Sequence, residues 1–202
     1  MVICWAMRLG SFLFYRVVVV GEDSRFNKIK KNFVHFLFTW IIQGFWITIT
    51  SGPAIVILTK ESQNKSNTLN MIEILGIVIW VIGMVIEAVA DYQKFVFKMQ
   101  DMKTTKFIQT GLWSYSRHPN YCAEIVIWIG VSVFGVSSLD GLEHAALISP
   151  IFVYLLLTTL SGVPILEGKA NKRWGNDPEY IKYKENTPVM FPWGKTGKSK
   201  NQ

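Results

Sequence analysis

The chain contains four apolar blocks, each about as long as the hydrocarbon core of a membrane is thick. A membrane-spanning helix needs roughly 20 predominantly apolar residues. The blocks run over Phe33 to Thr59, Asn70 to Val89, Tyr121 to Leu139 and Ala145 to Leu166. A fifth block, Met1 to Val20, is interrupted by Arg8 and Arg16. The sequence therefore predicts an all-α, polytopic membrane bundle with four to five transmembrane helices.

Lysine and arginine are distributed very unevenly among the predicted loops. If the spans alternate in direction, one side of the membrane carries Lys60 and Lys65. The other side carries Arg25, Lys28, Lys30, Lys31, Lys94, Lys98, Lys103, Lys106, Arg117 and eight more in the tail after Leu166. Because loops retained in the cytoplasm are rich in Lys and Arg, this second side, including the C-terminal tail, is predicted to be cytoplasmic.

The net charge of +7 is thus explained by membrane topology. No soluble nucleic-acid-binding motif accompanies it, so no nucleic acid partner is expected. The two cysteines, Cys4 and Cys122, lie far apart and lack the spacing of a metal site, so no metal is expected.

Four ionisable residues form a stripe at the end of the second firm span. Glu87, Asp91, Lys94 and Lys98 follow one another at intervals of four, three and four, which places them on one helix face. Ionisable groups within a membrane segment are functional candidates, because their burial is costly. The alternative is a ladder of exposed ion pairs at a helix end.

The segment that precedes the third span is rich in polar groups. It reads GLWSYSRHPNYCAE, residues 111–124. Pro119 suits the first turn of a helix, which would place Asn120 and Glu124 one turn apart and Arg117 and His118 just before the helix. A helix N-terminus beside Arg117 is a candidate phosphate site. Alternatively, Arg117 anchors a lipid headgroup and His118 is structural, in either protonation state.

A third cluster lies in the tail, where aromatic and basic residues alternate. Trp174, Tyr180 and Tyr183 are interspersed with Lys172, Arg173, Lys182 and Lys184. This mixture suits stacking on a base and pairing with phosphate. It equally suits an aromatic belt at the membrane interface.

Several separated blocks, in order, resemble the steroid 5-alpha-reductase-like family, specifically its DUF1295 branch. They read WAMRLGSFLFYR with GEDSRF, then ADYQKFVFK, GLWSYSRHPNYCAEIVIWIG and GVPILEGKANKRWGNDPEYIKYKENTPVMFP. The resemblance assigns residues 1–193 to one membrane domain and leaves 194–202 as a disordered polar tail. Because the chain begins in what resembles a mid-protein helix, we expect it to lack the family's N-terminal helices.

This resemblance implies an integral membrane oxidoreductase of lipid metabolism. It would use NADPH to reduce an enone-like double bond in a steroid or other lipid, in the endoplasmic reticulum if the cell is eukaryotic. The resemblance would give cofactor contacts to Glu87, Asp91, Lys98, Arg117, His118, Asn120, Tyr121, Glu124, Tyr180 and Tyr183. Lys98 stands where a reductase can carry arginine, and lysine keeps the charge but lacks the bidentate fork. No proton donor is identified.

Two alternatives stay open. The superfamily includes isoprenylcysteine carboxyl methyltransferases, so the chain could instead use S-adenosylmethionine to methylate a prenylcysteine or a phospholipid. The cofactors differ in charge: NADPH needs several cations around it, whereas S-adenosylmethionine needs few. The other alternative is a truncated, non-catalytic paralogue that keeps the fold.

Overall fold

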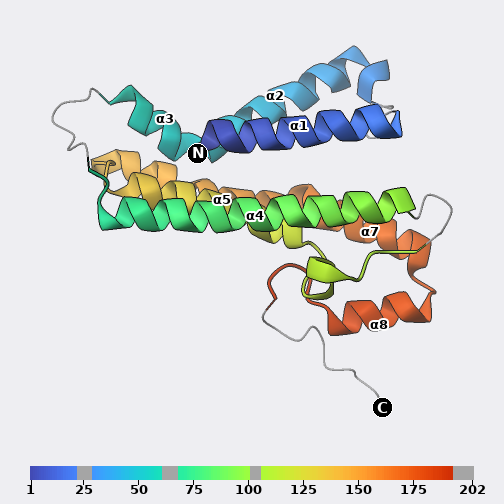
Figure 1. The fold of residues 1–202 in the computed structure, drawn as a ribbon. Helices are drawn as coiled ribbons and strands as arrows, with labels where there is room; N and C mark the ends of the chain where they lie inside the picture. Colours follow the sequence, from blue (N-terminus) through green and yellow to red (C-terminus); the bar gives the residue numbers. More distant parts are fainter. Residues whose placement is uncertain (22–28, 61–67, 101–105, 193–202) are drawn as a thin grey trace. The chain divides into compact units, whose positions relative to one another are not determined.

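The computed structural model describes residues 1–21, 29–60, 68–100 and 106–192, and within these ranges the chain is helical with no strand (Figure 1). The predicted all-α class is confirmed. The α-helices are α1 (Val2–Val20), α2 (Phe33–Thr50), α3 (Gly52–Thr59), α4 (Met71–Gln100), α5 (Pro119–Val136), α6 (Ser149–Leu155), α7 (Gly162–Trp174) and α8 (Pro178–Asn186). Shorter turns are η2 (Ile29–Lys31), η3 (Gly111–Ser114), η4 (Gly141–Ile148) and the π-helical η5 (Leu156–Leu160).

Five helical stretches are long and apolar enough to cross a membrane. They cover Val2–Val20, Phe33–Thr50, Met71–Gln100, Pro119–Val136 and Gly141–Trp174. The fifth predicted span, at the start of the chain, is therefore one of them. The chain is an integral, multi-pass membrane protein on this finding. The predicted disordered tail, 194–202, lies outside the described residues, as do Arg25, Lys28 and Lys103 of the predicted cytoplasmic loops.

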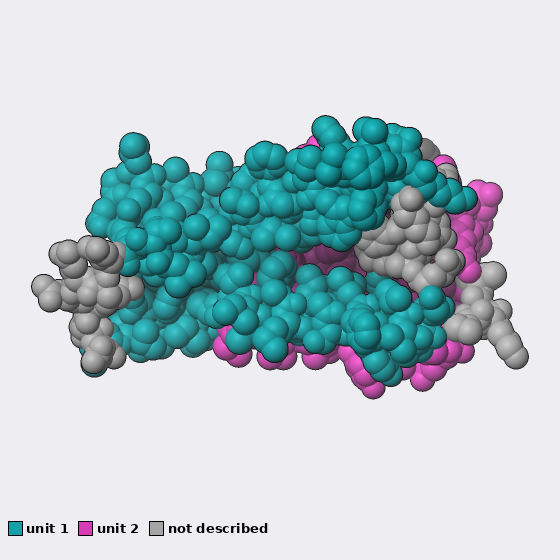
Figure 2. Space-filling view, turned by 90° about the horizontal axis from the view of Figure 1, so that it is seen from above, with its two compact units in different colours: residues 1–78, 128–152 teal, residues 79–127, 153–202 magenta. Residues whose placement is uncertain are grey.

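The chain divides into two compact units, coloured separately in Figure 2. Unit 1 comprises residues 1–78 and 128–152, and unit 2 comprises 79–127 and 153–202. In unit 1, the ring of Trp5 packs edge-on against those of Trp128 and Trp46, with centroids 5.0 and 6.5 Å away. Ser149 donates to the backbone carbonyl of Thr50 at 2.5 Å, and both residues are buried.

The predicted span from Phe33 to Thr59 is wrong as a single helix, because the helix breaks at Ser51. Pro53 explains the break: it lacks an N–H to continue the ladder, and in an unbroken helix its ring would clash with the carbonyl four residues earlier. A proline is tolerated at the start of a helix, and here it lies in the first turn of α3.

Helix α4 is longer than predicted. The apolar block ends at Val89, but the helix continues to Gln100. Thirty residues rise about 45 Å, whereas a hydrocarbon core is about 30 Å thick. All four residues of the predicted stripe, including Lys94 and Lys98 in the last turns, therefore lie in this one helix.

The predicted span from Ala145 to Leu166 is part of a longer, irregular stretch. The π-helical turn η5 closes with a bond from the Ser161 N–H to the Leu156 carbonyl, 3.0 Å. Two threonines of this turn, Thr158 and Thr159, donate to carbonyls one turn earlier. Single π-turns are often found at functional sites, and α7 begins directly after this one.

Candidate functional site

The candidate site lies in unit 2 and is built around residues 117–120, which we call the RHPN turn. Helix α5 begins at Pro119, as predicted, so Arg117 and His118 precede it. The side chain of Ser116 fixes the turn: its hydroxyl accepts from the His118 N–H at 3.2 Å and donates to the Met190 carbonyl at 2.5 Å. The Arg117 N–H donates to the carbonyl of Pro188, 2.9 Å away.

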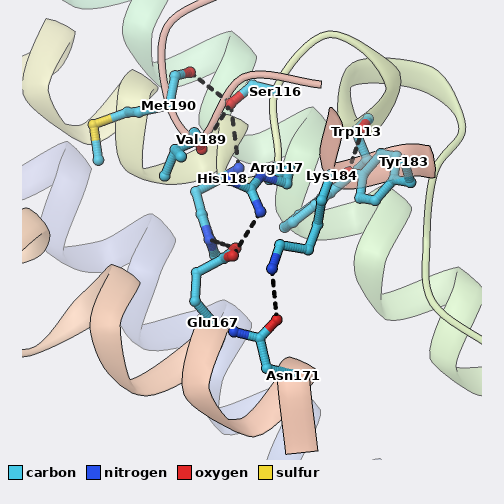
Figure 3. Close-up of polar contacts among 10 residues, drawn as sticks. All are labelled: Trp113, Ser116, Arg117, His118, Glu167, Asn171, Tyr183, Lys184, Val189 and Met190. Atoms are coloured by element: carbon cyan, nitrogen blue, oxygen red, sulfur yellow. Dashed lines mark hydrogen bonds and ion pairs between the residues drawn. The ribbon is translucent and has the colours of Figure 1, made fainter. Parts of the chain in front are cut away.

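Glu167 of α7 joins the two residues that precede α5 (Figure 3). Its carboxylate accepts from Nη1 of Arg117 at 2.6 Å and lies 2.9 Å from Nε2 of His118. The side chains are 9%, 6% and 19% exposed for Arg117, His118 and Glu167 respectively. We call these three residues the Glu167 cluster. These side chains are largely removed from water, so the charge of each must be compensated by the other members of the cluster.

The environment of His118 favours its neutral form. Burial lowers the pKa of His118 below its ordinary value, while the hydrogen bond and charge of Glu167 raise it in part. The ring also stacks on Tyr121, with centroids 5.6 Å apart and planes 12° from parallel. Tyr121 in turn lies against the backbone at Gly162, where α7 begins.

Helices α4 and α5 pack closely in an antiparallel register. A side chain at Gly83 would lie 2.8 Å from the backbone nitrogen of Ile127, so this close approach requires glycine. Nearer the RHPN turn, the Asn120 amide donates to the Asp91 carboxylate at 3.3 Å. Glu87 on α4 and Glu124 on α5 lie between these two contacts along the helix pair, and both side chains are buried. Glu87, Asp91, Asn120 and Glu124 form what we call the acidic row.

The loop before the RHPN turn is held on α4. The Trp113 indole N–H donates to the Ala90 carbonyl at 3.1 Å, and Gln93 accepts from the Leu112 N–H at 2.9 Å. Gly111 has φ +62°, and a side chain there would meet the Gln93 amide at 2.6 Å, so this turn requires glycine. The ammonium of Lys94 lies 4.5 Å from the centre of the Trp113 ring.

The tail tyrosines belong to an aromatic cluster centred on Phe107. Its ring lies 5.8, 5.0 and 5.4 Å from those of Trp174, Tyr180 and Tyr183. The Tyr183 hydroxyl donates to the Trp113 carbonyl at 2.6 Å. Burial raises the pKa of both Tyr180 and Tyr183, so both stay protonated at neutral pH. Helix α8 is thereby fastened to the loop that leads into the RHPN turn.

The structure thus groups the predicted residues in three sets. Arg117, His118 and Tyr121 face α7, the acidic row occupies the α4–α5 contact, and the tail tyrosines hold the loop between them. Lys98 lies in the last turn of α4, one turn beyond Lys94. Three residues with defined roles were not predicted: Glu167, Ser116 and Gln93. Glu167 could have been found by the criterion applied to Glu87, because it too is a carboxylate beside an apolar block.

Three polar residues of the RHPN turn each keep one buried polar atom without a hydrogen-bond partner among the described residues. These atoms are Nε of Arg117, Nδ1 of His118 and Oδ1 of Asn120. Native proteins satisfy nearly all buried polar groups, so such atoms call for a ligand or water. Nε of Arg117 carries a hydrogen and is a donor, whereas Oδ1 of Asn120 is an acceptor. By contrast, no group of three or more metal-ligating side chains occurs in the described ranges.

Comparison with known proteins gives one finding. The model of a family described as "Protein of unknown function (DUF1295)" matches residues 1–187. No curated protein and no solved structure matches the chain.

Proposed function

Because the chain belongs to the DUF1295 family, whose function is unknown, we propose its activity from the site: NADPH-dependent reduction of an enone-like double bond in a steroid or other lipid. The observation that carries this proposal is the set of unpartnered buried atoms in the RHPN turn. A phosphate oxygen could accept from Nε–H of Arg117, and a carboxamide N–H could donate to Oδ1 of Asn120. A nicotinamide dinucleotide carries both kinds of group.

The resemblance to the steroid 5-alpha-reductase-like family supports the same activity and points to a lipid substrate. The multi-pass character of the chain agrees with a substrate that resides in the bilayer. When bound, a reduced nicotinamide supplies the hydride, and the protein supplies orientation and electrostatics. The expected compartment in a eukaryotic cell is the endoplasmic reticulum.

One observation favours a second candidate, a methyltransferase that uses S-adenosylmethionine. The acidic row presents three carboxylates, while the guanidinium of Arg117 is already paired with Glu167 at 2.6 Å. Carboxylates around a cofactor suit a cationic sulfonium better than they suit the phosphates of NADPH. The substrate would then be a prenylcysteine or a phospholipid.

Equilibrium binding to the detergent-purified chain separates these candidates. We would measure NADPH and S-adenosylmethionine side by side, with Arg117→Lys as the test variant and Lys60→Arg, which alters an ion pair in unit 1, as the matched control. NADPH binding that weakens in the first variant and not in the control supports the reductase. Binding of S-adenosylmethionine alone supports the methyltransferase. Binding of neither supports a non-catalytic paralogue.

A further inference from the structure

His118 has the arrangement of a proton-transferring imidazole. One ring nitrogen, Nε2, is held by Glu167 at 2.9 Å, and the ring face stacks on Tyr121. The other nitrogen, Nδ1, is buried and has no hydrogen-bond partner in the described part of the chain. A ring fixed at one nitrogen and uncommitted at the other is suited to exchanging a proton with a bound molecule.

The partners of Glu167 determine which nitrogen is available. Arg117 lies 2.6 Å from the Glu167 carboxylate and favours its ionised form. An ionised carboxylate only accepts hydrogen bonds, so Nε2 of His118 must carry the proton in this contact. Nδ1 is then a lone-pair acceptor in the neutral ring and an N–H donor in the imidazolium.

We propose that Nδ1 of His118 is the proton-donating atom of this enzyme and that Glu167 is its positioning residue. The proposal rests on the proposed reductase activity, for which the sequence suggested no proton donor.

The step balances as follows. A hydride, which the NADPH of the proposed activity would supply as it is oxidised to NADP⁺, adds to the β carbon of the enone; it brings two electrons and shifts the double-bond electrons onto the carbonyl oxygen, giving an enolate. The enolate re-forms its carbonyl as the α carbon takes the proton from Nδ1–H of His118, and a C–H bond replaces the N–H bond. His118 is left neutral and recovers its proton from water. Glu167 stabilises the imidazolium before transfer and orients the ring.

The charged and titratable groups that act on His118 come from three elements. Glu167 on α7 favours the imidazolium, whereas Lys94 on α4 and Arg117 in the same turn disfavour it. Tyr121 on α5 stacks on the ring. Removing the charge of Glu167 should therefore make His118 harder to protonate, without touching the other two histidines of the chain, His35 and His144.

The first test follows the titration of His118 itself and needs no substrate. Exchange of the imidazole C2 proton for deuterium, measured by mass spectrometry across pH, reports each histidine of the purified, detergent-solubilised full chain. In Glu167→Gln the pKa of His118 should fall relative to wild type, while the exchange profiles of His35 and His144 should be the same in both proteins. An unchanged His118 profile overturns the positioning role.

The second test measures turnover with NADPH and a 4-en-3-one steroid in deuterium oxide. His118→Gln should lose about 100-fold or more in turnover, in line with the usual contribution of general acid catalysis. The Glu167→Gln variant should shift the pH–rate profile to lower pH. His144→Gln, an exposed histidine of unit 1, is the control and should leave turnover unchanged.

The two proposals fail in different ways. Full turnover by His118→Gln overturns the donor role while leaving the reductase intact. Absence of NADPH binding and oxidation in the wild-type protein overturns the reductase and the donor role with it. If His118→Gln does not fold, the pH–rate shift and the exchange profile of Glu167→Gln, which keeps the shape of the side chain, decide the question.

Discussion

Two ionic clusters among the described residues, one in each unit, put similar groups to different uses. In unit 1, Nζ of Lys60 lies 2.8 Å from Asp140 and 2.6 Å from Glu143, and it donates to the Ser138 carbonyl at 2.6 Å. The Asp140 side chain is 91% exposed. In unit 2, by contrast, the Arg117 and His118 side chains that meet Glu167 are less than a tenth exposed.

This difference separates a structural fastening from a candidate active site. We call Lys60, Asp140 and Glu143 the Lys60 cluster; it joins the end of α3 to the start of η4. Asp140 and Glu143 also form a capping box at the start of η4, in which the side chain of each accepts from the backbone N–H of the other. The hydrogen bond between Lys60 and Asp140 raises the pKa of Lys60 and lowers the pKa of Asp140. The Glu167 cluster bears a desolvation cost, and two of its polar atoms, Nε of Arg117 and Nδ1 of His118, still have no partner in the ranges that the structure describes. Such an arrangement is expected where function requires it.

The largest expected effect comes from Glu167→Ala. This change leaves Arg117 buried without its carboxylate, which should cost about 3–5 kcal/mol of unfolding free energy. Thermal or denaturant unfolding in detergent measures the loss. The control is Asp140→Ala in the solvated cluster, for which we expect a much smaller change. Equal losses in the two variants would show that the clusters do not differ in the way described here.

The next largest effect is on cofactor affinity. Arg117→Lys keeps a positive charge but removes Nε–H and the planar fork, so NADPH should bind about tenfold more weakly, or roughly 1.4 kcal/mol. Isothermal titration measures the affinity, and Lys60→Arg should leave it unchanged. Wild-type affinity in Arg117→Lys would mean that Nε is not a cofactor contact.

A smaller effect should appear in the pH dependence of stability. The pKa of His118 is lowered in the folded protein, so below about pH 6.5 the unfolded chain binds more protons at this residue. Stability therefore falls as the pH falls through that value. The melting temperature should drop less steeply between pH 7.5 and 5.5 in His118→Gln than in wild type, and identical slopes would refute this assignment.

The smallest effect is expected from Lys60→Met. Exposed ion pairs contribute little, since water and salt screen them and two long side chains must be ordered. We expect a melting temperature close to that of wild type at 0.15 M salt. A loss as large as that of Glu167→Ala would place the Lys60 cluster among the principal stabilising contacts.

The sequence predicts the spans well because length and hydropathy are local properties. The start of α5 was also predictable, since Pro119 and the polar residues before it form a recognisable helix beginning. Breaks within apolar blocks were missed. Composition does not distinguish a span from two helices separated at Pro53, nor does it reveal the π-turn at Leu156–Leu160.

Only part of the site was predictable, again because sequence patterns report on neighbouring residues. The members of the RHPN turn are adjacent in sequence, so their proximity is certain. Glu167 is 50 residues away from Arg117, and only tertiary packing brings the two together. The ion pair with Glu167 also changes the interpretation of Arg117, which the sequence analysis treated as part of a candidate phosphate site. Tyr183 likewise proves to hold the Trp113 carbonyl, a contact that no local pattern reveals.

The hydrogen bond from Ser116 to Met190 has a consequence for biosynthesis. The two residues are 74 positions apart. From the same segment as Met190, the carbonyl of Pro188 accepts from the Arg117 N–H. The RHPN turn is therefore synthesised well before the segment that completes its hydrogen bonds. Until that segment has been made, the Ser116 hydroxyl and the Arg117 N–H lack their native acceptors. A chain that ends before residue 190 would contain all five candidate spans and still lack the contact that completes the site.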